Sequence, residues 1–329
     1  MKRKILILGL LFAALALFSS CAGKTSGYFL LKGDLHVHTK FSYDGVYSIA
    51  DTIKYSKEDG FDFIALTDHN IVSQNDEIPK YKKSGIILIP GMEQTMEQGA
   101  GHANILGIVH PLLKYITKDN ANELWPVYYA DAKSMGALVQ INHPFDPKYY
   151  WSPDLGFIGN YDMIEVWNGV YTDDDKKAMD FWQGELAKGR KIPVTGGSDT
   201  HEGTTGRSPV NCVLVKEKTA SGILESVSDG HNYVSLTAGG PGATLEYGRS
   251  VMGDSVIAMP NTKLKFSVTG LKQGDKVMLI TADGVLNTYN AENGKVSGEL
   301  LVDANKKFYR ISAYRGESLI LFTNPIYFD

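Results

Sequence analysis

The sequence predicts an α/β fold in which helices alternate with the strands of a parallel sheet or barrel. Short apolar runs alternate with longer amphipathic stretches between residues 35 and 236, which is the pattern of repeated strand–helix units. Polar side chains such as Asp68, His69 and Asp199 directly follow apolar runs. Because barrel folds place their active sites at the carboxyl ends of the strands, these positions indicate one shared site.

The elements follow one another regularly along the chain. Apolar runs predict strands at residues 35–38, 61–66, 86–89, 103–108, 137–141, 163–167, 192–195, 212–215 and 233–236. Amphipathic stretches predict helices at residues 48–58, 120–135, 173–188 and 220–228. These elements together define a barrel-like domain over residues 33–238.

The character of the sequence changes at the Gly-Gly-Pro-Gly run of residues 239–242. Beyond it, short alternating runs at residues 263–268 and 276–280 are separated from later segments by the turn pairs Asp283-Gly284 and Asn293-Gly294. Residues 239–329 are therefore expected to form a small antiparallel β domain, similar to a sandwich. This segment shows no evident cluster of catalytic side chains.

The first residues are typical of an export signal. A basic start is followed by an apolar run that ends at Phe18 and then by Ser19-Ser20-Cys21. We expect a signal peptide at residues 1–20, a lipid on Cys21 and a tether over residues 21–32. The protein would then be exported and anchored in the cell envelope, facing the periplasm or in the outer membrane. The alternative is an ordinary cleaved signal in which Cys21 has no special role.

Composition restricts the function further. The chain has 329 residues, of which 43% are hydrophobic and 21% charged, so it can bury a sizeable core. Its formal net charge of −4 disfavours nucleic acid as a partner. With only two cysteines, a disulfide framework and a cysteine zinc cluster are both excluded, so a metal would be bound by His, Asp and Glu.

The pair His36 and His38 is the first candidate metal site. Residues two apart on a strand point to the same side, so both rings can reach one metal ion. The pair alone is a weak signal, but further ligand types recur at later predicted strand ends: Asp44, His69, Glu93, His102, His143, Asp199 and His201. Two of the eight histidines, His110 and His231, fall outside this set. Mixed histidine and carboxylate ligands suit zinc, manganese or iron.

Five short motifs carry a resemblance to a known family. In order they are Asp-Leu-His-Val-His-Thr, Thr-Asp-His, Gly-Met-Glu, Asn-His-Pro and Ser-Asp-Thr-His, between residues 33 and 236. This set resembles the polymerase and histidinol phosphatase (PHP) superfamily. The resemblance implies a distorted (β/α)7 barrel that binds up to three metal ions. The end of the chain, around residues 324–327, is similar to the tails of exported members, including carbamate-hydrolase-like relatives.

The resemblance also implies a ligand set. The first metal would be held by His36, His38, Glu93 and Asp199; the second by Glu93, His143 and His102; the third by Asp44, His69 and His201. Asp44 departs from members that have His at this position, and Tyr43 is an extra residue before it. His102 could instead orient another ligand from behind or contact the substrate. Asp68 is expected either to orient the site from behind or to cap a turn.

A site that holds two or three divalent metal ions predicts a hydrolase. They would activate a hydroxide for attack on a small phosphate ester, with Glu93, Asp199 and His201 at the reacting centre. Arg207 could recognise the phosphate, or it could be an exposed loop cation. The same hydroxide could hydrolyse a carbamate, an amide or a carboxylic ester. A non-catalytic binding module of the cell envelope is the alternative of another class.

Overall fold

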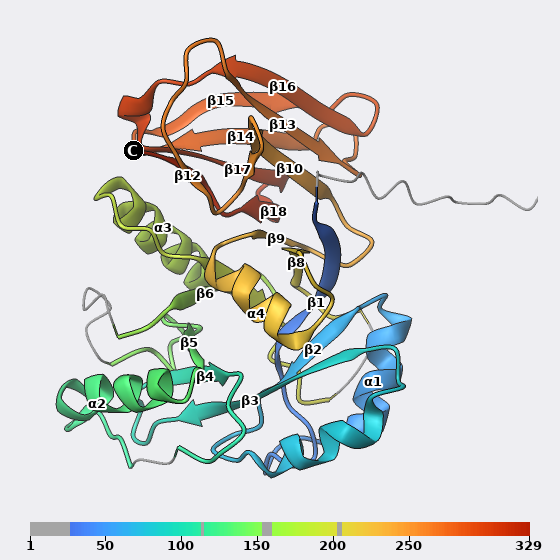
Figure 1. Cartoon of the computed structure of the whole chain (residues 1–329), viewed down its shortest axis with the longest axis vertical. Coiled ribbons are helices and arrows are strands. Elements are labelled where there is room, and N and C mark those ends of the chain that lie inside the picture. Colours follow the sequence, from blue (N-terminus) through green and yellow to red (C-terminus); the bar gives the residue numbers. More distant parts are fainter. Residues whose placement is uncertain (1–26, 113–114, 153–159, 203–205) are drawn as a thin grey trace, which may run out of the picture.

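The computed structural model describes residues 27–112, 115–152, 160–202 and 206–329 (Figure 1). The predicted signal peptide, the lipidated Cys21 and most of the predicted tether lie outside these residues. Within the described part of the chain, none of the helices is long and apolar enough to cross a membrane.

Seven strands form the part of the sheet that carries the candidate site. They are β1 (Phe29–Val37), β2 (Phe63–Leu66), β3 (Ile87–Thr95), β4 (His102–Leu106), β5 (Leu138–Asn142), β6 (Met163–Asn168) and β7 (Val194–Gly197), and they pair in this order. β1, β2 and β3 are parallel, as are β5, β6 and β7, whereas β4 is antiparallel to both of its neighbours. The reversed β4 is the distortion in an otherwise parallel barrel.

The curled sheet closes where β7 returns to β1. The backbone N–H of Asp199 donates to the carbonyl of His36 at 3.0 Å, and the N–H of His38 donates to the carbonyl of Thr200 at 3.0 Å. These bonds lie directly beside the first pair of histidines. The predicted distorted barrel is thus confirmed, and its seam runs through the candidate site.

The helices begin where the sequence indicates. α1 (Ile49–Glu58), α2 (Ala121–Ser134), α3 (Asp173–Ala187) and α4 (Ala220–Ser228) match the four predicted helices within two residues at each end. α1 and α3 each begin with a capping box, in which Ser48 pairs with Asp51 and Thr172 pairs with Asp175. One 3₁₀ segment, η1 (Ser73–Tyr81), is an element that the apolar periodicity did not predict.

Two strands of the predicted set are longer than expected, with consequences for the site. β1 begins at Phe29, inside the segment expected to be a tether, because residues 29–33 pair with β8 (Val210–Val215). β3 continues to Thr95, so Glu93 lies within a strand and does not follow it. The extension of β3 exists because β4 pairs with it from residue 91 to residue 95.

The C-terminal part is antiparallel, as expected, apart from the parallel pair of β12 with β19, and it consists of strands and one 3₁₀ turn. These are β10 (Gly242–Tyr247), β11 (Ser250–Val251), β12 (Ser255–Val256), β13 (Lys263–Thr269), β14 (Lys276–Thr281), β15 (Gly284–Asn290), β16 (Lys295–Leu301), η2 (Ala304–Lys306), β17 (Phe308–Arg315), β18 (Ser318–Thr323) and β19 (Ile326–Phe328). β10, β11, β13 and β16 make a separate four-stranded sheet.

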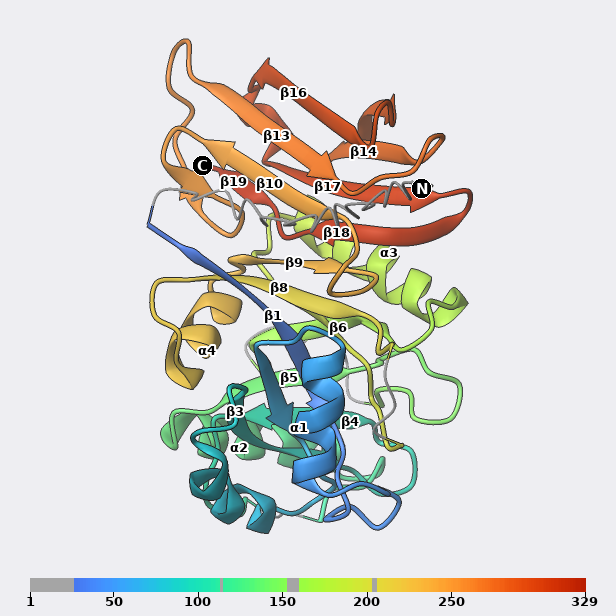
Figure 2. The ribbon, with the colours of Figure 1, turned by 90° about the vertical axis from the view of Figure 1, so that its right-hand side faces the viewer.

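The two parts of the chain share one sheet. β18 pairs with β9 (Asn232–Ser235), and β9 pairs with β8, so hydrogen bonding continues from the C-terminal strands into the barrel. Figures 1 and 2 show the C-terminal strands, in orange and red, stacked at the end of the molecule opposite α1 and α2. The C-terminal strands therefore continue the barrel sheet through β9 and β8.

Candidate metal centre

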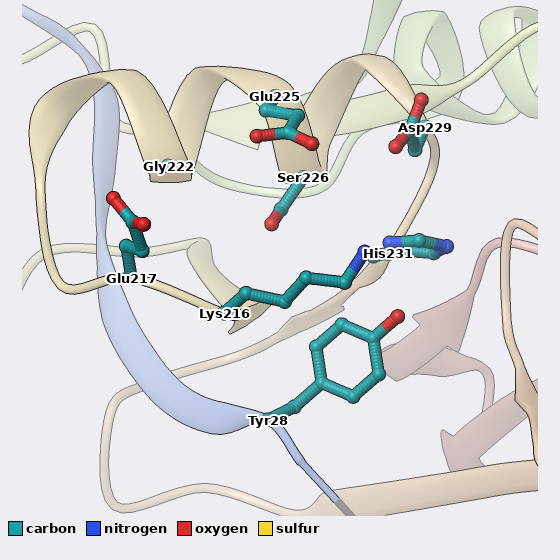
Figure 3. A pocket seen from close by; sticks show the side chains of 8 residues that line it. All are labelled: Tyr28, Lys216, Glu217, Gly222, Glu225, Ser226, Asp229 and His231. Carbon is teal, nitrogen blue, oxygen red and sulfur yellow. The ribbon is translucent and has the colours of Figure 1, made fainter.

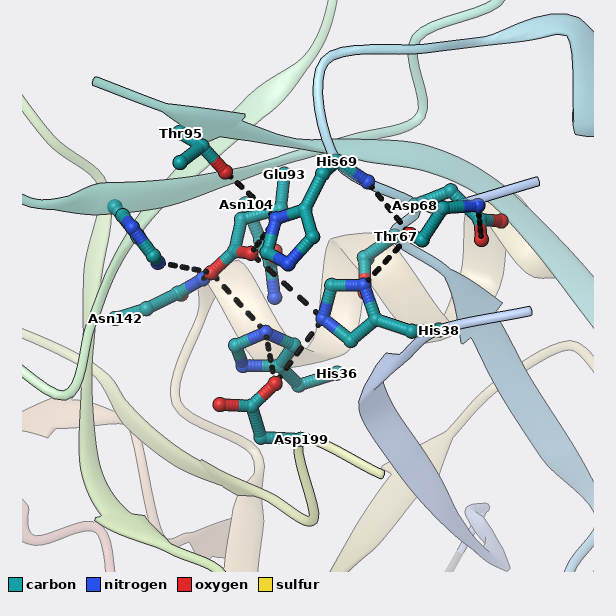
Figure 4. Close-up of polar contacts among 12 residues, drawn as sticks. His36, His38, Thr67, Asp68, His69, Glu93, Thr95, Asn104, Asn142 and Asp199 are labelled. Atoms are coloured by element: carbon teal, nitrogen blue, oxygen red, sulfur yellow. Dashed lines mark hydrogen bonds and ion pairs between the residues drawn. The ribbon is translucent and has the colours of Figure 1, made fainter. Parts of the chain in front are cut away.

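The structure brings together the predicted histidine and carboxylate ligands from six strands and the loops that follow them (Figure 4). Three groups each have ligand atoms within 4.8 Å of one another: His36 with His38 and Asp199, Glu93 with His102 and His143, and His38 with His69 and His201. The second group has the residues of the second predicted metal position. The first group lacks the predicted Glu93, and in the third group His38 stands where Asp44 was predicted.

The first group converges on two carboxylates. The Nε2 atom of His36 lies 3.2 Å from Oε1 of Glu93 and 3.2 Å from Oδ1 of Asp199. The Nε2 atom of His38 lies 3.1 Å from the same Asp199 oxygen and 3.7 Å from Oε2 of Glu93. Figure 4 shows both rings turned toward Glu93 and Asp199. His36 and His38 therefore point to the same side, as the strand spacing predicts.

Both histidines are oriented from behind by their other ring nitrogen. Nδ1 of His36 lies 3.0 Å from Oε1 of the buried Glu165, and Nδ1 of His38 lies 3.1 Å from the Ser42 hydroxyl. A proton on each Nδ1 leaves the Nε2 lone pair free, which is the arrangement that metal-binding histidines use.

Glu93 is the central carboxylate and is completely buried. A buried polar chain orients it: Thr195 donates to Gln140 at 2.7 Å, Gln140 donates to Asn142 at 3.0 Å, and Asn142 donates to Oε1 of Glu93 at 2.8 Å. This chain ties Glu93, on β3, to the two strands β5 and β7. It thus fixes the carboxylate where histidines of the first and the second group face it.

The second group meets the same Oε1 atom of Glu93 that His36 faces. Nδ1 of His102 is 3.3 Å and Nε2 of His143 is 3.6 Å from the same Glu93 oxygen. Since His102 opens β4, the antiparallel strand turns this ring toward the site. The geometry therefore favours His102 as a ligand over its alternative role as a substrate contact.

The third group is the most open. Oδ2 of Asp44 is 3.5 Å from Nε2 of His69 and 3.5 Å from Nε2 of His201, and the Asp44 side chain is 36% exposed. The Nδ1 atom of His201 is 2.9 Å from the carbonyl of Asp199, which leaves Nε2 facing His69 and Asp44. Asp44 is thus a fitting ligand despite the extra Tyr43 before it.

The charges of the centre act strongly on one another. Burial alone would lower the pKa of His36, but the negative charges of Asp199, Glu165 and Glu93 outweigh it and hold this pKa well above its usual value. Burial would raise the pKa of Glu93, yet His102 and His36 hold it well below its usual value. The pKa of Asp199 is likewise lowered, with burial opposed mainly by His36 and His38. Glu93 and Asp199 therefore stay ionised, and their negative charge favours the binding of cations.

Several buried ligand atoms lack a hydrogen-bond partner in the described part of the chain. They include Nε2 of His36 and of His38, Oε2 of Glu93 and Oδ1 of Asp199. Unpaired buried polar atoms are costly, and here they all face one another. Divalent cations would satisfy nitrogen and oxygen atoms together, so the donor set fits the predicted metals. Mixed ligands of this kind suit zinc, manganese and iron alike.

Two of the ligands have unusual backbone angles, and the nearby Gly197 can only be a glycine. His143 and Asp199 have positive φ angles of 28° and 51°, a region that non-glycine residues rarely adopt. At Gly197, a β-carbon would lie 2.2 Å from Oε1 of Glu165 and 2.4 Å from the β-carbon of His36. Only glycine permits this close approach of β7 to β1.

Asp68 combines its two expected roles. Its carboxylate accepts hydrogen bonds from the backbone N–H groups of Thr39 and Ser42 at 2.7 and 3.0 Å, which fixes the turn after β1. The Ser42 hydroxyl in turn contacts His38 and accepts the N–H of His69 at 3.0 Å. Asp68 thus caps a turn and, through Ser42, orients two ligands.

Arg207 lies apart from these ligands. Its Nε donates to Asp59 at 2.9 Å, one Nη donates to Ser56 at 2.8 Å, and its guanidinium stacks 4.7 Å from the centre of the Phe61 ring. The side chain is only 2% exposed and is packed against the end of α1. These contacts do not support the prediction that Arg207 recognises a phosphate, nor the alternative of an exposed cation.

Sequence reasoning missed Glu165. Its two oxygens serve His36 and, at 3.1 Å, the backbone N–H of His143, while Asn168 donates to it at 2.9 Å. The available signal was a single carboxylate within the apolar run of residues 163–167, where an unpaired charge would be too costly to bury.

Two cavities are relevant to the histidines of the chain. One, of about 270 Å³, adjoins the candidate metal centre and is lined in part by His143, Glu165 and Asn168. The other, of about 210 Å³, is formed by Tyr28, α4 and the loop before it (Figure 3). It contains His231, which pairs with Asp254 at 2.9 Å. His231 and the exposed His110 thus take no part in the centre, as predicted.

Comparisons with known proteins agree with this architecture. The PHP domain matches residues 34–167. An uncharacterized protein of Methanocaldococcus jannaschii is 28% identical over 155 residues, which cover 44% of this chain and 85% of that protein. A two-domain protein of Bacteroides vulgatus, described as containing a predicted PHP-like metal-dependent phosphoesterase, has a similar structure. Its TM-score is 0.55 at 20% identity, and the match covers 91% of this chain and 96% of that one. Residues 34–167 thus match the PHP domain, and the likeness to the two-domain protein shows a shared fold.

Proposed function

We propose that the protein is a metal-dependent hydrolase that cleaves a small phosphate ester at the candidate metal centre. One observation carries the proposal: histidine and carboxylate atoms from strands far apart in the sequence converge in three groups, and several buried ones have no hydrogen-bond partner among the described residues. A centre of this kind suits two or three cations of zinc, manganese or iron. Bound divalent cations lower the pKa of a water ligand and neutralise charge on a substrate oxygen.

The residues of the chain would hold and orient this chemistry. Glu93 would serve the first and second positions, since its Oε1 atom faces both His36 and His102. Asp199 would serve the first position and His201 the third, at the open side of the centre. Because Arg207 is directed elsewhere, the cations would meet the charge of a phosphate in its place.

A direct test compares metal content with activity. The purified protein is stripped with a chelator, reloaded with zinc, manganese or iron(II), and assayed with an aryl phosphate, a phosphodiester, an aryl carbamate and an aryl acetate. We expect metal-dependent turnover of a phosphate ester. Turnover of the carbamate or acetate without turnover of either phosphate would instead establish the alternative chemistry.

The same experiment separates the proposal from a binding role. Stoichiometric metal with no turnover of any of the four substrates would favour a non-catalytic envelope module. His36→Ala is the matched control, because it removes a ligand of the first group and should abolish any true activity.

We also propose that the protein is exported and anchored by a lipid on Cys21. The proposal is supported by the basic start, the apolar run and the small residues before Cys21. Replacement of Cys21 by Ser should release the protein from the membrane fraction. If Cys21→Ser stays in that fraction, the anchor lies elsewhere.

A further inference from the structure

The cavity of about 210 Å³ beside α4 contains charged side chains of both signs (Figure 3). The ammonium group of Lys216 and the carboxylates of Glu217, Glu225 and Asp229 line it, and none of these residues is a candidate metal ligand. None of the four groups forms an ion pair with another residue that the structure describes. Opposite charges that share a cavity without pairing suit a ligand that carries both charges itself.

The wall of this cavity also contains a buried hydroxyl group. Ser226 is 5% exposed, and its hydroxyl has no hydrogen-bond partner within the described part of the chain. Figure 3 shows this hydroxyl directed from α4 toward the Lys216 side chain. The buried His231 holds Asp254 with Nε2 at 2.9 Å, and its ring meets Tyr28 edge to face with centroids 5.6 Å apart. Because an unpaired buried polar group is costly, Ser226 favours a ligand with polar atoms.

The cavity lies where the described chain begins. Tyr28, which lines it, is the second described residue and follows Cys21 by seven positions. A fully extended residue spans at most about 3.6 Å, so a lipid on Cys21 would keep this side of the protein within about 25 Å of the bilayer. The head groups of that bilayer are therefore the molecules at highest concentration beside the cavity.

The surface next to the cavity suits a bilayer as well. Phe29 and Leu30 follow Tyr28 and are 48% and 38% exposed, although apolar side chains gain stability by burial. The amine of Lys218 lies 4.7 Å from the centre of the Phe29 ring, and that of Lys216 lies 5.8 Å from the centre of the Tyr28 ring. Aromatic rings accompanied by long basic side chains are typical of protein surfaces at the level of lipid head groups.

We propose that this cavity binds the head group of a phosphatidylethanolamine lipid while the anchored protein lies on the bilayer. The inference goes beyond the proposed hydrolysis and rests on the proposed lipid on Cys21. The phosphate would meet the Lys216 ammonium and the Ser226 hydroxyl, and the primary ammonium of the lipid would meet the carboxylates of Glu225 and Asp229. A choline head group has the same charges, but its methylated nitrogen has no N–H to donate to a carboxylate.

The first test measures the preference for a head group in solution. The full-length protein, extracted from membranes in detergent, is titrated by calorimetry with glycerophosphoethanolamine, glycerophosphocholine and glycerophosphoglycerol. We expect the ethanolamine compound to bind about tenfold more tightly than the other two, because it alone donates charge-assisted hydrogen bonds to the carboxylates. Equal affinity for the three compounds, or no binding of the ethanolamine compound, would overturn the proposal.

Two substitutions separate the two ends of the head group. Lys216→Gln should weaken the binding of all three compounds alike, since each of them carries the phosphate. Glu225→Gln should reduce the preference for the ethanolamine compound toward one without weakening the glycerol compound. Glu123→Gln is the matched control, because Glu123 is an exposed glutamate on α2. The assignment fails if Glu225→Gln keeps the preference or if Glu123→Gln loses it.

The second test identifies the source of the head group. The full-length protein is anchored in vesicles of phosphatidylcholine alone or of an equal mixture with phosphatidylethanolamine. Free glycerophosphoethanolamine should bind about tenfold more weakly on the mixed vesicles, since a lipid of the same bilayer competes at a high effective concentration. Equal binding to protein retained on both kinds of vesicle overturns this inference alone. Release of the protein from both kinds of vesicle overturns the anchor and this inference together.

Discussion

The clearest test of the proposed centre is a change at Glu165, which would touch no metal ion itself. One oxygen of Glu165 holds Nδ1 of His36, and the other accepts hydrogen bonds from the His143 backbone N–H and from Asn168. In Glu165→Gln, an amide oxygen can face only one of these sides. The amide NH₂ then meets donors on the other side, so His36 or His143 loses its anchor.

The size of the effect follows from these contacts. Loss of a partner that orients a metal ligand lowers metal affinity or activity by about 10- to 100-fold, which corresponds to about 1.4 to 2.7 kcal/mol. The substitution also removes the negative charge that helps to raise the pKa of His36. We therefore expect a weaker affinity for the first metal within that range, with the fold retained.

Metal affinity can be measured by titration calorimetry or by competition with a coloured chelator, alongside circular dichroism to confirm folding. Glu185→Gln is the matched control, because Glu185 is another buried glutamate that lies away from the centre. Glu185 lies on α3 and pairs with Lys188 and Arg190, which follow that helix. The reasoning is refuted if Glu165→Gln binds metal as tightly as the native protein, or if Glu185→Gln weakens it equally.

Three further predictions concern stability. Arg207→Ala should lower the free energy of unfolding by about 3 to 5 kcal/mol, because it removes the ion-pair partner of the buried Asp59 carboxylate. Urea denaturation measures this change, and a loss of activity without a loss of stability would contradict the prediction. Burial raises the pKa of Asp175 to about 6, above its unfolded value of 3.8. Its contribution is therefore fully present below pH about 4 and is lost as the pH rises through 6, by up to about 3 kcal/mol. Asp175→Asn should flatten this part of the profile relative to the native protein, and an unchanged difference between pH 4 and pH 7 would count against it. Removal of metal with a chelator should lower Tm, since a ligand that binds only the folded state stabilises it; an equal Tm with and without metal would mean that the centre is not loaded.

Much of the centre could be predicted from the sequence, because its ligands follow local rules. The side-chain period of two in a strand places His36 and His38 on one side whatever surrounds them. The other ligands lie at predicted strand ends, in the order of a known motif set. The helix starts at Ser48 and Thr172 could also be predicted, since a capping box is a local arrangement of four residues.

The remaining features depend on partners that lie far away in the chain. β4 runs antiparallel because of its pairing with β3 and β5, and the same pairing draws Glu93 into a strand. Arg207 is taken from the predicted site by Asp59, which lies 148 residues earlier. No local pattern distinguishes an arginine that binds phosphate from one that pairs with a helix end.

The sequence by itself determined which histidine and carboxylate residues meet in the candidate centre and that the scaffold is a barrel of alternating strands and helices. The tertiary structure alone decided how these ligands are oriented, through Glu165, Ser42 and Asn142. It also decided that the C-terminal strands join the barrel sheet through β18 and β9. The physical reason is the range of the interactions: strand periodicity acts over a few residues, whereas hydrogen bonds and ion pairs join residues that only folding brings together.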